Sequence, residues 1–100
     1  MPYVLEANRS VVETTLDQVA AYVGIDGGFD GFLERVLELR SGFSVPDDLV
    51  QLGVDAAATE TIAAAAVLDP SSGGNPQPFT HDLAAAIFDN ACAGRLEATA

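Results

Sequence analysis

Few side chains in this sequence are able to perform acid–base, nucleophilic or metal chemistry. His81 is the only histidine and lies beside Asp82 at a predicted helix start, where an imidazole is most often exposed but is also able to act as a ligand or proton carrier. Ser71 and Ser72 have only this histidine near them in sequence, and no nucleophile-elbow motif surrounds them. A catalytic metal needs about three converging ligands. We therefore predict no catalytic residue and no metal site within the chain.

Cys92 is the only cysteine, so it has no partner for an internal disulfide. It lies on a predicted helix, where a free cysteine behaves as a small core residue. A reactive thiol needs a cationic neighbour, and Arg95, three residues later, is the candidate. Of these two interpretations we favour the core residue.

A polar segment over residues 69–80, rich in Ser, Gly, Asn and Pro, connects two predicted helices. Long defined loops usually do more than connect. A phosphate cradle needs a preceding strand and a helix that begins at the glycines. Here no strand precedes the loop, and Pro76 and Pro78 separate its glycines from the helix that Thr80 begins. We therefore interpret the segment as a loop without a phosphate site.

The hydrophobic periodicity predicts an all-α fold, a small bundle of four main helices and one short helix. Residues 1–8 resemble the last turns of another helix. The main helices are expected over residues 10–23, 29–40, 56–68 and 80–93, and the short helix over 46–52.

Helix ends are predicted from capping residues. Ser10 and Glu13 match a capping box, whereas Asp55 and Thr80 are expected to cap their helices with the side chain alone. Gly24 is expected to end its helix in the left-handed conformation, and Gly53 and Gly94 are expected to end theirs.

The apolar spacing also predicts which residues form the core. The expected core residues are Val12, Leu16, Val19, Ala20, Val23, Phe29, Phe32, Leu33, Val36, Leu37, Leu49, Val50, Leu52, Ala58, Ile62, Ala63, Ala66, Val67, Leu83, Ala84, Ile87, Phe88 and Ala91, with Leu39 as a further candidate. The Ala63–Ala66 run is apolar all round, which suggests burial on both sides of its helix.

Composition limits the classes of partner. One hundred residues suit a single domain, here residues 1–100. Fifteen acidic residues against four arginines give a net charge of −11, which repels nucleic acid and anionic membranes. No apolar run approaches the ~20 residues of a membrane span. The start of the chain has no secretory signal pattern, so we expect a cytoplasmic location.

Three segments, in order, resemble the iron-containing (group III) alcohol dehydrogenases. Met1-Pro2-Tyr3-Val4-Leu5-Glu6-Ala7-Asn8 is similar to the family's Leu-Pro-x-Val-Leu-x-Phe-Asn. Residues 45–54 are similar to its Ile-Pro-x-x-Leu-x-x-Leu-Gly-Val, and residues 69–80 to its Asp-x-Cys-Thr-Gly-x-Asn-Pro-Arg-x-Leu-Thr. The Pro-Tyr-Val opening and a late Ala-Gly-Arg look more like the maleylacetate reductase branch.

The resemblance implies the distal part of a dehydroquinate synthase-like helical domain. Family members also have a nucleotide-binding domain, use NAD(P) and Fe²⁺ or Zn²⁺, and place the active site between the two domains. Their Asp and His ligands lie upstream of the segment that matches Met1. The resemblance places Ser71, Ser72 and Asn75 beside the substrate cleft. Ser71 stands where many members have Cys, and Gln77 where they have Arg.

Two functions follow as expectations. In the first, the chain is one wall of a dehydrogenase or maleylacetate reductase cleft, binds no cofactor and oxidises no NAD(P)H alone, and partners the nucleotide-binding domain or another helical subunit. In the second, it is a standalone acidic helical module that binds another protein without redox chemistry. An exposed apolar patch of several hundred Å² favours the first, and its replacement by polar groups the second.

Overall fold

A computed structural model describes residues 1–96 of the chain. Its α-helices are α1 (Pro2–Ala7), α2 (Arg9–Val23), α3 (Gly28–Gly42), α4 (Thr59–Leu68) and α5 (His81–Ala93). Short 3-10 helices are η1 (Val50–Leu52), η2 (Ala56–Ala58) and η3 (Pro70–Gly74). No strand occurs within residues 1–96, so the predicted all-α class is confirmed.

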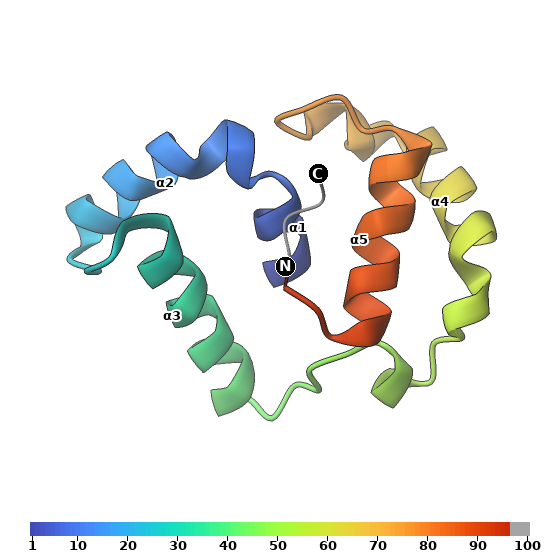
Figure 1. The fold of residues 1–100 in the computed structure, drawn as a ribbon, viewed down its shortest axis with the longest axis horizontal. Coiled ribbons are helices and arrows are strands. Elements are labelled where there is room, and N and C mark those ends of the chain that lie inside the picture. The colour runs from blue at the N-terminus through green and yellow to red at the C-terminus, as the bar shows by residue number, and fades with distance from the viewer. Residues whose placement is uncertain (97–100) are drawn as a thin grey trace.

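The helices form two pairs, one on each side of α1 (Figure 1). α2 packs against α3, α4 packs against α5, and α1 contacts α2, α3 and α5. Arg9 ties the α2–α3 pair to α1, because its guanidinium pairs with Glu6 and Asp30 and lies 4.2 Å from the centroid of the Phe29 ring. The radius of gyration is 14.2 Å, against about 13 Å for an average domain of this length. The arrangement is therefore more open than average.

Several helix ends agree with the sequence predictions. Asp55 accepts a hydrogen bond from the Ala57 amide at 2.9 Å, and Thr80 accepts one from the Leu83 amide at 3.1 Å. Gly24 has the predicted left-handed conformation, and Gly53 and Gly94, which end helices as predicted, also have positive φ.

We expect Thr80→Ala to lower the free energy of unfolding by about 1 kcal/mol, because the Leu83 amide loses its capping acceptor. Urea denaturation followed by circular dichroism measures this change. Thr14→Ala, at an exposed position inside α2, is the control, and it should change stability by less than about 0.5 kcal/mol. Equal losses in the two variants would contradict the capping role.

The capping box predicted at Ser10 is wrong. α2 begins at Arg9, directly after Asn8, and makes no side-chain cap hydrogen bond. Glu13 instead lies 3.9 Å from Arg9. Asn8 takes the N-cap position instead, and its carbonyl accepts hydrogen bonds from the Val11 and Val12 amides, so Ser10 lies inside the helix.

Two connecting segments also differ from prediction. The helix predicted over 46–52 is reduced to the 3-10 turn η1, and the Asp48 carboxylate accepts hydrogen bonds from the Gln51 amide and side chain, each at 2.9 Å. The 69–80 loop is not wholly irregular, because Asp69 caps η3 by accepting from the Ser71 amide.

Phe29 on α3 is the largest fully buried side chain. The other buried residues include Leu33 on α3, Ala63 on α4, and Ala84, Phe88, Ala91 and Cys92 on α5. Other parts of the predicted core are wrong. The exposed ones are Val19, Val23, Leu39, Val50, Leu52 and Ile62, because α2, α3, η1 and α4 each have one face that no described element covers. Ala64 and Ala65 are exposed as well, so α4 is buried on one side and not on both.

None of the helices described within residues 1–96 is long and apolar enough to cross a membrane.

Candidate functional site

A groove of about 700 Å³ lies between the α1–α2 corner and the η3 loop. The three loop residues that the resemblance singles out, Ser71, Ser72 and Asn75, all line it. The opposite wall is mostly apolar and consists of Val4, Leu5, Asn8, Val11, Val12, Thr15 and Leu16, with Gly74, Pro76 and Phe79 added by the loop. The volume lies within the range of about 300–1,000 Å³ that is usual for ligand sites.

Three side-chain amides hold the loop against the α1–α2 corner, and we name Asn8, Asn75 and Gln77 the amide clamp. The Asn8 Nδ2 donates to Asn75 Oδ1 at 2.8 Å, and Asn75 Nδ2 donates back to Asn8 Oδ1 at 3.1 Å. Gln77 Nε2 donates to Asn8 Oδ1 at 3.0 Å and to the Ala7 carbonyl at 2.9 Å. Asn8 is 4% exposed. The clamp therefore positions the loop through part-buried polar groups that satisfy one another.

The clamp residues Asn8 and Gln77 are functional candidates that the sequence analysis missed. Gln77 stands out in the sequence only as a departure from the family's Arg, and its side chain is directed at the Ala7 carbonyl. Asn8 gives only a weak signal in the sequence, because its hydrogen-bond partner Asn75 is 67 residues away.

The serine hydroxyls are directed into their own loop. Ser71 Oγ donates to the Asp69 carboxylate, and Ser72 Oγ donates to the Asp69 carbonyl at 2.7 Å. The hydroxyl and amide of Ser71 lower the pKa of Asp69, so this carboxylate stays ionised at neutral pH. Each serine donates its one hydroxyl proton within the loop, so each hydroxyl has only acceptor lone pairs left for a molecule in the groove.

His81 lies apart from these serines, between α5 and α4. Its Nε2 is 3.3 Å from a Glu60 carboxylate oxygen, and it does not line the groove. The imidazole is partly rather than fully exposed. Among residues 1–96, no group of three His, Cys, Asp or Glu side chains is placed to hold a metal ion.

Cys92 is buried on α5, as the core interpretation predicts. Burial raises the pKa of its thiol, and Asp89, Asp48 and Asp55 raise it further. Three carboxylates therefore outweigh the effect expected from Arg95, and the thiolate that a reactive cysteine needs is disfavoured.

We expect native Cys92 to react with a thiol reagent such as DTNB at least tenfold more slowly at pH 8 than the urea-unfolded chain does. The reason is that both burial and the raised pKa suppress the thiolate. Absorbance at fixed reagent concentration follows the reaction. Equal rates before and after unfolding would contradict the burial of this thiol.

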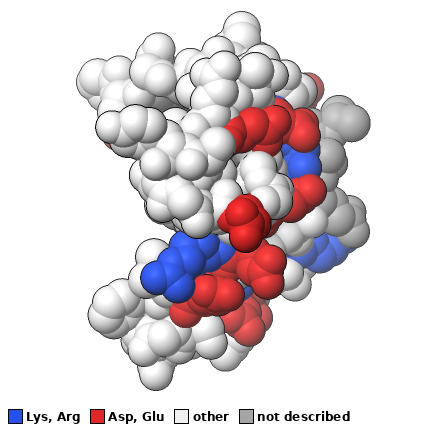
Figure 2. Space-filling model, turned by 90° about the vertical axis from the view of Figure 1, so that its left-hand side faces the viewer, with Lys and Arg blue, Asp and Glu red and all other residues white. Residues whose placement is uncertain are grey.

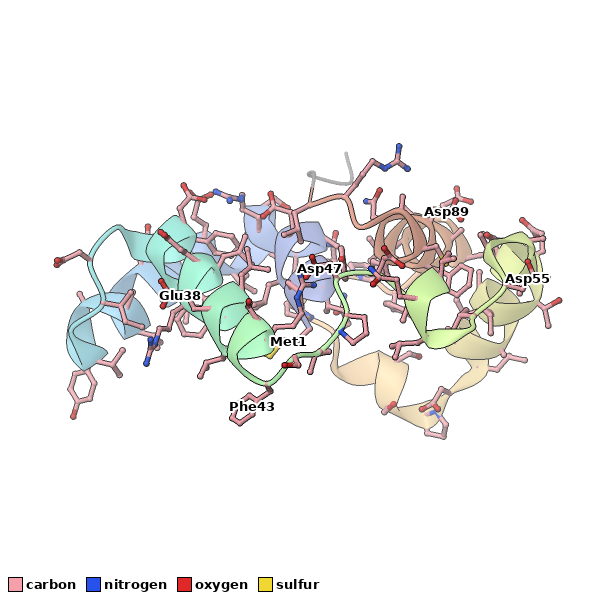
Figure 3. The ribbon with its side chains drawn as sticks, turned by 90° about the horizontal axis from the view of Figure 1, so that it is seen from below. Met1, Glu38, Phe43, Asp47, Asp55 and Asp89 are labelled. Carbon is pink, nitrogen blue, oxygen red and sulfur yellow. The ribbon has the colours of Figure 1, made fainter. Side chains whose placement is uncertain are left out.

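A smaller cavity of about 240 Å³ lies where α1, the end of α3 and residues 45–52 meet. Met1 and Asp47 are among the residues that line it, and Figure 3 shows the Phe43 side chain directed away from the helices. Arg40 Nη2 lies 3.3 Å from Asp47 Oδ1, and Arg40 Nη1 donates to the Tyr3 hydroxyl at 3.3 Å. These contacts hold residues 45–52 against α1 through Nη1 and Nη2, whereas the buried Arg40 Nε has no hydrogen-bond partner among residues 1–96.

No family model, no curated protein and no solved structure matches this chain.

Proposed function

We propose that the chain is one wall of the active-site cleft of a metal-dependent, NAD(P)-linked alcohol dehydrogenase or maleylacetate reductase. In this proposal a nucleotide-binding domain, or another helical subunit, supplies the metal and the dinucleotide. The chain itself supplies the α1–α2 corner and the loop with Ser71, Ser72 and Asn75. The fold is then the distal part of a dehydroquinate synthase-like helical domain, and the location is the cytoplasm.

The groove carries the proposal. The resemblance names Ser71, Ser72 and Asn75 as cleft residues, and these residues line a cavity of ligand size. They do so because the amide clamp fixes their loop to the segment that resembles the family's Leu-Pro-x-Val-Leu-x-Phe-Asn. Two of the three resembling segments, 67 residues apart at Asn8 and Asn75, therefore meet at one site.

The exposed apolar surface supports a partner. Thirteen large apolar side chains are exposed within residues 1–96, among them Tyr22 at 92%, Leu68 at 82% and Phe43 at 78%. Single exposed apolar residues are ordinary, but uncovered faces on several helices are typical of a chain that packs against another. The alternative, a standalone acidic interaction module, is favoured by the net charge of −11.

Reconstitution tests the proposal. A maleylacetate reductase truncated before its own Leu-Pro-x-Val-Leu segment is mixed with the chain, and NADH oxidation is followed at 340 nm with maleylacetate or a simple aldehyde. We expect turnover from the mixture and none from either part alone.

Matched variants connect turnover to the groove. Ser71→Trp places a bulky ring at the groove, and it should reduce the restored turnover at least tenfold. Ser10→Trp changes another exposed serine that does not line the groove, and it should have little effect. Turnover by the chain alone, or a complex in which the two variants behave identically, would contradict the proposal.

A further inference from the structure

The polar side chains on the loop side of the groove donate their protons within the protein. The amide and the hydroxyl of Ser71 both donate to the Asp69 carboxylate, and those of Ser72 both donate to the Asp69 carbonyl. The Asn75 amide donates to the Ser72 carbonyl, and Asn75 Nδ2 makes two hydrogen bonds, to Asn8 Oδ1 and to the Gln77 carbonyl. These donors are therefore not available to a molecule in the groove.

The same serines keep acceptors. A hydroxyl has one proton and two lone pairs, so Ser71 Oγ and Ser72 Oγ are still able to accept a hydrogen bond. Asn8 also lines the groove, but it is 4% exposed and its amide belongs to the amide clamp. Among the described lining residues, Thr15 on the opposite wall is the only other one with a hydroxyl, and most of that wall is apolar. The groove therefore matches an apolar molecule that brings its own donor.

The electrostatics of the groove disfavour an anion. Among the described residues, no charged side chain lines it, so a carboxylate would find no cation there. Asp69 lies one hydrogen bond behind Ser71, and its lowered pKa keeps it ionised at neutral pH. Figure 2 faces the α2–α3 side of the molecule, where acidic side chains cover more of the surface than Lys and Arg do. An anion without donors or a counter-charge loses its hydration without compensation.

We propose that the groove binds an uncharged small molecule with an apolar body and one O–H or N–H donor, which the hydroxyl oxygens of Ser71 and Ser72 accept, and that it rejects carboxylates. The assignment deepens the proposed function and rests on it for calling this molecule a substrate. Of the two substrate classes that the proposed function leaves open, it selects an uncharged molecule over a dicarboxylate such as maleylacetate.

Three probes of one size test the ligand class on the chain alone. Benzyl alcohol is uncharged and has a donor, benzyl methyl ether is uncharged and has none, and benzoate is charged at pH 7 and has none. Amide chemical shifts of the isotopically labelled chain are followed as each probe is added in 0.15 M salt, where exposed charges are screened beyond about 8 Å.

We expect benzyl alcohol to bind with a Kd of about 1–10 mM, which is ordinary for a molecule of so few atoms. The shifts should lie at groove residues such as Val12, Ser72 and Asn75. The ether should bind at least about threefold more weakly because it lacks the hydrogen bond. Benzoate should bind at least about tenfold more weakly because its charge is not compensated.

The double variant Ser71→Ala/Ser72→Ala removes both acceptors. Benzyl alcohol should then bind no better than the ether, whereas binding of the ether should be unchanged. A displaced loop would weaken both probes equally, so the ether separates recognition from structure. Ser71→Ala alone serves if the double variant displaces the loop, because alanine keeps the amide that donates to Asp69. Ser10→Ala, at an exposed serine that does not line the groove, is the control and should change neither Kd.

A charge placed in the groove should reverse the preference. Thr15 is exposed and lines the groove, so Thr15→Arg should strengthen benzoate binding at least about fivefold and leave benzyl alcohol unchanged. Thr14→Arg adds the same charge at the neighbouring exposed position, which does not line the groove, and it should have little effect on either probe.

Three outcomes overturn the ligand class: no shifts at the groove with benzyl alcohol, equal binding of benzyl alcohol and its ether, or benzoate binding as tight as that of the alcohol. Binding of benzyl alcohol without reconstituted turnover would keep the ligand class and reject the dehydrogenase proposal. Reconstituted turnover without binding of benzyl alcohol would keep the dehydrogenase proposal and reject the ligand class.

Discussion

Asn8→Ala should lower the free energy of unfolding by about 2–3 kcal/mol, because it removes three hydrogen bonds and leaves Asn75 Oδ1 without a donor in a part-buried site. The loss should also release the 69–80 loop from the α1–α2 corner. Urea denaturation measures the stability change, and amide hydrogen exchange at Ser71, Ser72 and Asn75 measures the release of the loop.

Asn90→Ala is the matched control for the amide clamp. Asn90 is partly buried on α5, and its known contacts are made by its backbone carbonyl, which alanine retains. We expect a loss of about 0.5 kcal/mol or less and unchanged exchange in the loop. A clamp that contributes nothing would give the same small loss in both variants.

Phe29→Ala should have the largest effect, about 3–5 kcal/mol of unfolding free energy. The ring is 2% exposed and stacks under the Arg9 guanidinium at 4.2 Å from its centroid. Its removal leaves a cavity and takes away the surface against which Arg9 joins α1, α2 and α3. For a domain whose total stability is about 5–15 kcal/mol, a large unfolded fraction at 37 °C is expected.

Phe43→Ala is the matched control, because it removes the same phenyl ring from an exposed position. Phe43 is 78% exposed at the end of α3, so its loss should change stability by less than about 0.5 kcal/mol. Thermal denaturation by circular dichroism compares the two variants. Similar melting temperatures for both would show that the α2–α3 pair does not depend on a core around Phe29.

Local signals predicted much of the fold because local contacts produce it. Thr80, Asp55, Gly24 and Gly94 act within four residues of their own positions, so their capping roles follow from the sequence alone. The capping box at Ser10 failed because Asn8, the C-cap of α1, is also the N-cap of α2, so Ser10 lies inside the first turn of the helix.

Periodicity identified the apolar faces, but it does not say which of them the chain itself covers. Val19 and Val23 have the spacing of core residues and are exposed, because α3 packs against the neighbouring face that contains Ala20. The groove shows the same limit. Ser71, Ser72 and Asn75 were named from a resemblance, but Asn8 and Gln77 are joined to them only by long-range folding.

In the proposed function, the loop with Ser71, Ser72 and Asn75 faces a cleft that a nucleotide-binding partner completes. Amide chemical shifts of the isotopically labelled chain, recorded as the truncated reductase and NADH are added, test it most directly. We expect the largest shifts at residues 71–75 and along the α1–α2 corner, and smaller ones on the exposed side of α4. Shifts confined to α4, or no shifts with saturating partner, would contradict the account.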